Sequence, residues 1–67
     1  MSSVARVIEI SAQSKKSFED AIEAGLTRAE KTLRNVTSAW VKEQRVDVAK
    51  GKITGYQVNL LVTFVLD

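Results

Sequence analysis

The side chains best suited to chemistry in this 67-residue chain are carboxylates, amides and a few aromatic rings, because the sequence contains no His and no Cys. Glu9, Glu43 and Asp47 stand apart, and no spacing between them fixes a general acid opposite a general base. Neither glycine-rich phosphate-binding motif is present. The sequence therefore predicts a protein that is not an enzyme.

Three further carboxylates, Glu19, Asp20 and Glu23, lie close together in the sequence. If symmetry repeats such oxygen ligands around an axis, they suit a hard divalent cation such as Ca²⁺. The same residues also suit the positive end of a helix dipole and a solvated surface. This second interpretation is favoured, and a divalent cation stays an alternative without assigned ligands.

Three segments have the patterns of strands. Residues 4–10 are short and rich in β-branched side chains, and residues 37–48 alternate. Residues 53–66 follow a turn in which Gly51 is available for a positive φ. One face of this third segment carries apolar side chains at strict period two: Tyr56, Val58, Leu60, Val62, Phe64 and Leu66.

A polar connector, residues 11–17, leads into a predicted helix over about residues 15–35, and Ser14 or Ser17 can cap its start. Gly25 costs a helix roughly 1 kcal/mol relative to Ala, so it is predicted to permit a close approach between the helix and the sheet. Steps of three and four residues build one apolar stripe: Phe18, Ile22, Leu26, Ala29, Leu33 and Val36.

The order of elements predicts an α+β, β-α-β-β fold: a three-stranded antiparallel sheet half-wrapped around one helix, in a single domain over residues 1–67. One helix covers one face, so the other face is expected to expose apolar patches that mark an interface or a ligand site. A domain this small also has a limited core. Self-association is therefore predicted through the uncovered face: Trp40, Val46, Val48, Leu61 and Val65, mixed with Ser38, Gln57 and Asn59.

Charge and hydropathy limit the classes of partner and the location that the sequence predicts. Ten Lys and Arg against eight Asp and Glu give a net charge of +2, and the charges are interspersed, which disfavours nucleic acid. No stretch approaches the roughly 18 apolar residues of a membrane span. The first ten residues lack the pattern of a signal peptide. With no Cys in the chain, a cytoplasmic location is expected.

The chain resembles the dodecin family over nearly its whole length. The resemblance implies a hollow shell of twelve identical subunits that binds flavins such as riboflavin or FMN, stacked between aromatic side chains, for storage without turnover. Some members bind coenzyme A, and one branch is described as calcium-binding. The similar segments are Val7–Ile10 (VIEI), Ser17–Ile22 (SFEDAI), Ala29–Arg34, Gly51–Ile53, Tyr56–Val58 and Val62-x-Phe64-x-Leu66.

The sequence departs from the family at the stacking aromatic. Counted without gaps from Tyr56 and Gln57, the family's Trp position is Ser38, and the chain's single Trp is Trp40. A ring that is moved by two residues along a strand stays on the same face but shifts by about 6.5–7 Å. That shift is as large as the stacking range of roughly 4.5–7 Å between ring centroids. Trp40 therefore fills a subunit interface, which is favoured, or stacks a ligand shifted along the sheet.

Gln57 stands where family members hydrogen-bond the polar edge of the flavin. Its amide has four hydrogen-bonding sites, which suit a uracil-like ring edge and suit contacts between subunits equally. The candidate ligand-binding residues implied by the resemblance are therefore Gln57, Trp40 and Ser38, the last as a hydrogen-bond donor that cannot stack.

Functions of different class follow from these observations. The favoured one is a non-enzymatic, dodecin-like homododecameric shell with weak or altered small-molecule binding. The alternative is a flavin-binding storage protein for riboflavin or FMN, and a further alternative is a calcium-binding dodecin-like protein.

Overall fold

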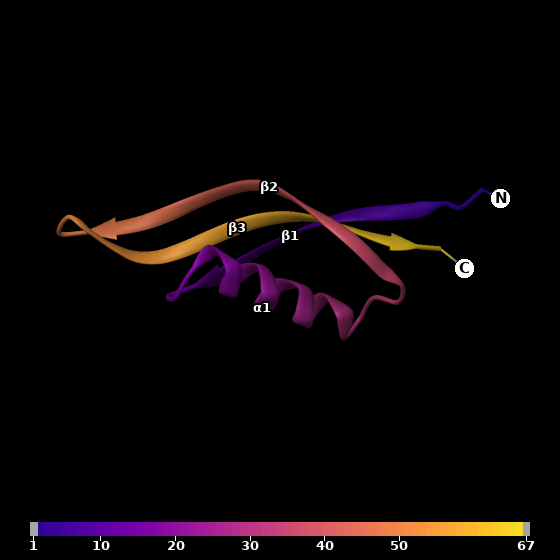
Figure 1. Ribbon diagram of the computed structural model, residues 1–67, viewed down its shortest axis with the longest axis horizontal. Coiled ribbons are helices and arrows are strands. Elements are labelled where there is room, and N and C mark those ends of the chain that lie inside the picture. The colour runs from indigo at the N-terminus through magenta and orange to yellow at the C-terminus, as the bar shows by residue number, and fades with distance from the viewer. Residues whose placement is uncertain (1, 67) are drawn as a thin grey trace.

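The computed structural model describes residues 2–66 as a three-stranded sheet with one helix packed against it (Figure 1). Strand β1 (Ala5–Ser14) leads to helix α1 (Phe18–Glu30), and strands β2 (Val36–Ala49) and β3 (Lys52–Val65) follow. The strand order is β1-β3-β2, and both pairings are antiparallel. The predicted β-α-β-β order and fold class are confirmed.

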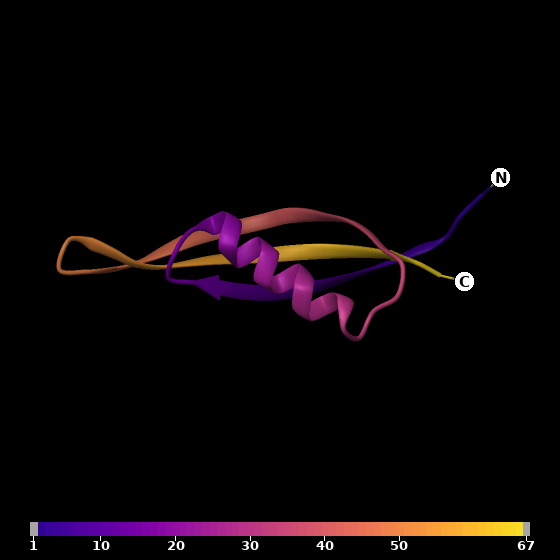
Figure 2. The ribbon, with the colours of Figure 1, turned by 60° about the horizontal axis from the view of Figure 1, so that its bottom comes forward.

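The sheet is much longer than the helix that packs on it. The β2–β3 hairpin projects past the start of α1, and both chain ends lie at the opposite end of the molecule (Figure 1). Figure 2 shows α1 lying obliquely across the sheet, and its contacts are with β1 and β3. The result is an elongated slab of 53 × 20 × 13 Å in which β2 lies largely outside the footprint of the helix.

A small core forms where the helix meets the middle of β3. Val58, Leu60 and Val62 on β3 are fully buried together with Ala21 of α1, as the period-two pattern predicts. The Phe18 ring meets the Tyr56 ring edge-on, with 5.1 Å between centroids. Half-buried apolar side chains complete the cluster: Ile8, Ile10, Ala12, Phe18, Ile22, Leu26, Leu33, Val36 and Ala39.

Two predicted boundaries were wrong. Residues 11–14 continue β1 rather than forming a connector, because each pairs with a residue of β3. The helix ends at Glu30 instead of near residue 35, and Asn35 adopts a φ of 61° before the chain enters β2. Leu33 and Val36 therefore lie beyond the helix, although both still pack against the core.

The start of α1 and the hairpin turn follow the sequence closely. Of the two candidate caps, Ser17 takes the role, since its hydroxyl accepts a hydrogen bond from the Asp20 amide at 2.9 Å. Ser14 instead donates to the Asp20 carboxylate at 2.6 Å and ties the end of β1 to the first helical turn. Lys50 and Gly51 both have positive φ, 54° and 77°, which suits a two-residue hairpin. No helix within residues 2–66 is long and apolar enough to cross a membrane.

Strand β2 does not alternate regularly, and this corrects one prediction. Val41 and Glu43 pair with neighbouring residues of β3, so Lys42 between them is the extra residue of a β-bulge. From Glu43 onward, the side chains of β2 therefore point to the faces opposite to those that regular alternation predicts. Val46 consequently pairs with Tyr56 on the helix side of the sheet, so its predicted place on the uncovered face is wrong. A second register shift separates Asp47 from Val48, which pairs with Ile53 near the hairpin turn.

Gly25 is buried where α1 crosses the sheet, and the predicted close approach is confirmed. A Cβ at this position would meet the Cβ of Ala12 at 3.1 Å, Cδ1 of Leu60 at 3.3 Å and Cδ1 of Ile10 at 3.5 Å. Contacts this short require the neighbours to move, and the core is already close-packed around them. A larger residue at position 25 therefore pushes the helix away from β1 and β3.

We expect Gly25→Ala to lower the free energy of unfolding by about 1 kcal/mol, because overpacking costs roughly 1–3 kcal/mol and the gain in helix propensity offsets about 1 kcal/mol. Adding Ala12→Gly should reduce this penalty by making room for the new methyl group. Ala24→Gly, at the exposed neighbouring position, measures helix propensity alone. Chemical denaturation at fixed subunit concentration gives all three values, and a Gly25→Ala variant more stable than the parent would contradict the close approach.

Candidate functional site

The three candidate residues all lie on the sheet face opposite α1. Gln57 alternates along β3 with the buried core positions, and Ser38 and Trp40 of β2 pair with the outward residues Thr63 and Leu61. Trp40 is 61% exposed. The predicted facing of Ser38, Trp40 and Gln57 therefore agrees with the structure.

One copy of the chain does not bring Gln57 close to either position 38 or position 40. Trp40 lies opposite Leu61 and Ser38 opposite Thr63, which are four and six residues from Gln57 along β3. At about 3.3 Å per residue these separations are roughly 13 and 20 Å. Within one copy, neither side chain therefore lies next to Gln57.

Gln57 belongs to a network of polar side chains that crosses all three strands. Its Oε1 accepts from Gln13 Nε2 at 3.0 Å, and its Nε2 donates to Ser11 Oγ at 3.1 Å. Longer contacts of 3.5 Å run from Gln57 Nε2 to Asn59 Oδ1 and from Asn59 Nδ2 to Glu43 Oε1. Ser11 and Gln13 were not expected as neighbours of Gln57, because the first strand was predicted to end at residue 10. Glu43 was not expected opposite Asn59, because the bulge at Lys42 was not predicted.

Two shallow hollows flank this network. One, of about 200 Å³, is open to solvent on the β2 side, and its lining comes from β2 and β3: Glu43, Gln44, Arg45, Gln57 and Asn59. The other, of about 300 Å³, lies toward the hairpin: Gln13, Ser14, Lys15, Asp47, Thr54, Gly55 and Tyr56. Both hollows are open to solvent, and neither encloses a ligand within a single copy.

The surroundings of Trp40 differ from those of Ser38. The bulge at Lys42 directs its ammonium across the sheet to Glu9, with 3.0 Å between Nζ and Oε1, and Glu9 shares a row with Leu61 and Trp40. The hydrogen bond and the negative charge of Glu9 raise the pKa of Lys42 above its ordinary value. Glu9, expected to be isolated, is thus ion-paired, and Trp40 stands beside an exposed charged pair.

Ser38 has a neutral setting. It lies opposite Thr63, whose other neighbour in the row is Val7. The Thr63 hydroxyl is buried and has no hydrogen-bond partner among residues 2–66. Position 38 therefore offers one accessible hydroxyl, that of Ser38, and the apolar side chain of Val7, with no aromatic surface in the row.

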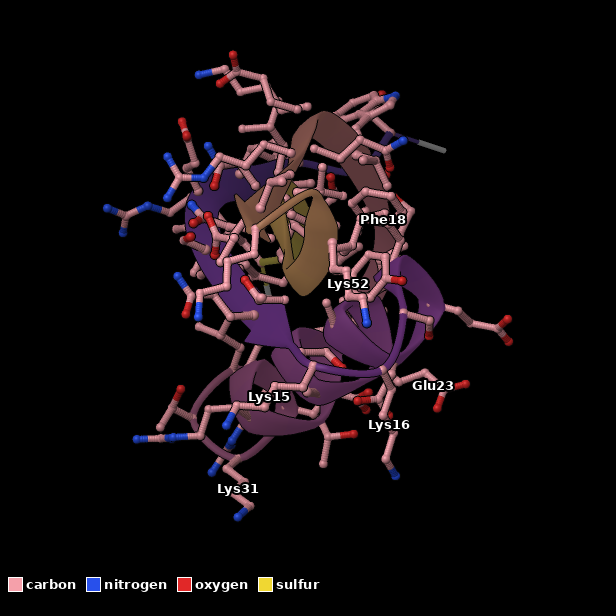
Figure 3. The ribbon with its side chains drawn as sticks, turned by 90° about the vertical axis from the view of Figure 1, so that its left-hand side faces the viewer. Lys15, Lys16, Phe18, Glu23, Lys31 and Lys52 are labelled. Carbon is pink, nitrogen blue, oxygen red and sulfur yellow. The ribbon has the colours of Figure 1, made fainter. Side chains whose placement is uncertain are left out.

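The carboxylates of α1 do not assemble a metal site within one copy. Asp20 is engaged by Ser14, while Glu19 and Glu23 line an open surface. Figure 3 shows Glu23 directed away from the sheet, as are Lys15, Lys16 and Lys31. Over residues 2–66, the structure holds no group of three or more Asp or Glu side chains that could bind a metal ion.

Large apolar side chains remain exposed along the β2 side of the slab. Trp40 is exposed on the outer face, and Val41 and Val46 are 46% and 38% exposed on the helix side, beyond the reach of α1. Val7 of β1 adds a further 46% exposed valine on the outer face. Apolar surface on both faces of one edge is typical of a protein that buries it against another chain.

Comparison with known proteins connects this geometry to one family. The family model for dodecin matches residues 4–67. A curated dodecin from Thermus thermophilus is 39% identical over 67 residues, which span 100% of this chain and 97% of the relative.

Solved structures give the same result. The dodecin from Streptomyces davaonensis has a TM-score of 0.91 at 34% identity, covering 100% of this chain and 98% of that one. A calcium dodecin from Mycobacterium tuberculosis, described as a calcium-chelating antigen with a novel calcium-binding site, has a TM-score of 0.81 at 34% identity, covering 96% and 91% of the two chains.

The fluorescence of Trp40 reports whether its face is covered in solution. Trp40 is the chain's single Trp and is 61% exposed in one copy. We therefore expect its emission to shift to the blue when dilute subunits assemble, because assembly removes the ring from water. Emission spectra over a dilution series, read beside the measured mass, test this. An unchanged, water-exposed emission in the assembled protein would exclude Trp40 from any interface.

Proposed function

Because the chain belongs to the dodecin family, we propose that it forms a non-enzymatic shell of twelve identical subunits whose small-molecule site differs from that of flavin-binding relatives. Three features of a single copy support the assembly: a small core, an elongated shape and exposed apolar side chains along β2. The subunit's main partner is then its own copy. The balanced, interspersed charge supports a protein without a nucleic-acid partner, and the lack of Cys supports the cytoplasm.

The observation that carries the altered site is Ser38 at the position where the resemblance places the family's Trp, with the chain's single Trp two residues further along β2, at Trp40. Both face the uncovered side, but the indole lies one row nearer to Gln57 than the family's aromatic position. The displacement of about 7 Å matches the full range over which aromatic rings stack. Flavin held in the family's usual pose would meet the Ser38 hydroxyl in place of an indole, so its binding is weak or shifted.

Flavin storage, for riboflavin or FMN, is the second candidate, and Gln57 favours it. The amide is on the uncovered face, held by Gln13 and Ser11, and keeps hydrogen-bonding capacity for a ring edge. In this version Trp40 of one copy stacks a flavin whose polar edge reaches Gln57 of another.

Calcium binding is the least supported candidate. The Mycobacterium tuberculosis neighbour is described as binding calcium. Calcium needs six to eight oxygen ligands, and no group of three carboxylates gathers within residues 2–66 of this chain. A calcium ion would therefore have to take its ligands from several copies.

The assembly is tested by native mass spectrometry and sedimentation. We expect a particle of about twelve times the 7.4 kDa subunit mass, which falls apart only when the subunits also lose their fold. A well-folded 7.4 kDa monomer in dilute solution would contradict the shell and every site that depends on two copies.

Titration with riboflavin and FMN, followed by flavin and Trp40 fluorescence, tests the altered site. We expect weak binding by the wild-type protein and binding at least about tenfold tighter by Ser38→Trp, because stacking on an aromatic side chain contributes roughly 1–3 kcal/mol. Thr27→Trp, which adds the same ring on the exposed side of α1, is the matched control and should change nothing. Saturable wild-type binding at micromolar concentration or tighter, with no gain in Ser38→Trp, would favour flavin storage through Trp40 instead.

A further inference from the structure

The outer edge of β2 pairs with no other strand within residues 2–66. The strand order β1-β3-β2 gives β2 a partner on one side only, so alternate backbone N–H and C=O groups along its 14 residues point away from the sheet. Such an edge fits a β-strand of another chain. We infer that the bulges of β2 keep this edge from pairing with a strand of another copy, whatever the number of copies in the assembly.

The residues of β2 would suit such pairing if the strand were regular. The basic and acidic side chains between residues 42 and 47 balance each other. In an antiparallel pair centred between Gln44 and Arg45, Lys42 of one copy lies opposite Asp47 of the other, and opposite charges attract. The sequence contains no Pro, and many residues of β2 favour strands: Val36, Thr37, Trp40, Val41, Val46 and Val48. Composition and charge therefore do not protect the edge.

The backbone of β2 is interrupted, whereas that of β1 is not. All ten residues of β1 pair with β3 in one register. On β2, Thr37 and Lys42 are extra residues, and a single register is kept only over residues 38–41 and 43–47. An extra residue bends the strand and increases its twist, so it also displaces the groups on the outer edge. A regular strand of another copy cannot follow this edge past Lys42.

The side chain of Lys42 opposes a neighbouring strand as well. Its Nζ lies 3.0 Å from Oε1 of Glu9 on β1, so the side chain runs back over β3 rather than out past the edge. Both partners are 46% exposed. A strand that continued the sheet beyond β2 would bring its own side chains beside this ion pair and remove water from it, which is costly.

An open edge on β2 would allow the sheet to grow from copy to copy. The outer edge of β1 is also unpaired within residues 2–66, and it is regular. If β2 of one copy paired with β1 of the next, each addition would leave a new free edge, and such head-to-tail contacts produce filaments unless they close into a ring. With β2 blocked, edge pairing joins two copies at most, through their β1 strands. The bulges thus let the exposed apolar side chains of β2 meet another copy without merging the two sheets.

Deletion of Lys42 tests the inference, because it removes a bulge without removing a pair. Val41 already pairs with Leu60, and Glu43 pairs with the adjacent residue Asn59. The deletion therefore joins the two regular stretches into one, and it takes away an exposed side chain. We expect the variant to form particles of roughly twice the wild-type mass or more, which grow with protein concentration and bind thioflavin T.

Two control variants separate the backbone from the charge. Lys42→Gln keeps the extra residue but loses the ion pair with Glu9, and we expect it to keep the wild-type mass. A glycine inserted between Gln44 and Arg45 of the deletion variant interrupts the strand again and should return the mass to the wild-type value. Native mass spectrometry and sedimentation at several concentrations give the masses, and circular dichroism confirms the fold.

A folded deletion variant with the wild-type mass at every concentration would overturn the inference. Equally large particles from Lys42→Gln would also overturn it, because charge and not the backbone would then protect the edge. The comparison is always with the wild-type mass, whatever that mass is. A wild-type protein that does not form twelve-subunit particles therefore contradicts the proposed shell without deciding the role of the bulges.

Amide hydrogen exchange in the assembled wild-type protein is a second test and needs no variant. An unpaired edge leaves every other amide of residues 43–47 without a partner strand. We expect these amides to exchange roughly a hundredfold or more faster than the alternate amides that face β3. Slow exchange at every residue of this stretch would show that a strand of another copy pairs with β2. That result would overturn the inference even if the deletion variant does not fold.

Discussion

The length of helix α1, set against the length of the strands it packs on, governs this structure. Its 13 residues span about 20 Å, whereas the 14 residues of β3 span about 46 Å. The helix can therefore bury only the middle of β3 fully, at Val58, Leu60 and Val62. It also lies over β1 and β3 rather than β2. Apolar side chains on both faces of β2 consequently stay exposed in a single copy.

Because α1 packs on only one face of the sheet, the opposite face can carry polar side chains. A sheet face that is covered from the start has to be apolar, because each buried polar group without a partner is costly. The face opposite α1 is free of that requirement, and it holds Gln57 and Asn59 in the middle of β3, directly behind the core. These side chains and their neighbours Ser11 and Gln13 satisfy one another within a single copy. The Gln57 and Asn59 amides therefore each have partners within one copy.

The sequence predicted this architecture wherever one periodicity acted alone. Strict alternation along β3 identified the core face, and with it the outward facing of Gln57. The prediction failed where a bulge or a helix end interrupted the periodicity of the apolar side chains. The bulge at Lys42 leaves no mark in residue types, so Val46 was placed on the wrong face. Leu33 continues the apolar stripe of the helix past its end at Glu30, because a side chain in the connection can reach the same core. The neighbours of Gln57 were missed because a polar strand end resembles a loop.

Positions 38 and 40 of β2 differ in more than their distance from Gln57. An aromatic side chain at position 38 would lie among Val7 and Thr63, a neutral setting in which a planar ligand displaces little bound water. At position 40 the indole lies beside the pair formed by Glu9 and Lys42. A flat, neutral ring stacked there would remove that pair from water, and desolvation of charges opposes the gain from stacking. A subunit contact that leaves the pair at its solvated rim avoids this penalty. The pair formed by Glu9 and Lys42 thus sets position 40 apart from the neutral surroundings of position 38.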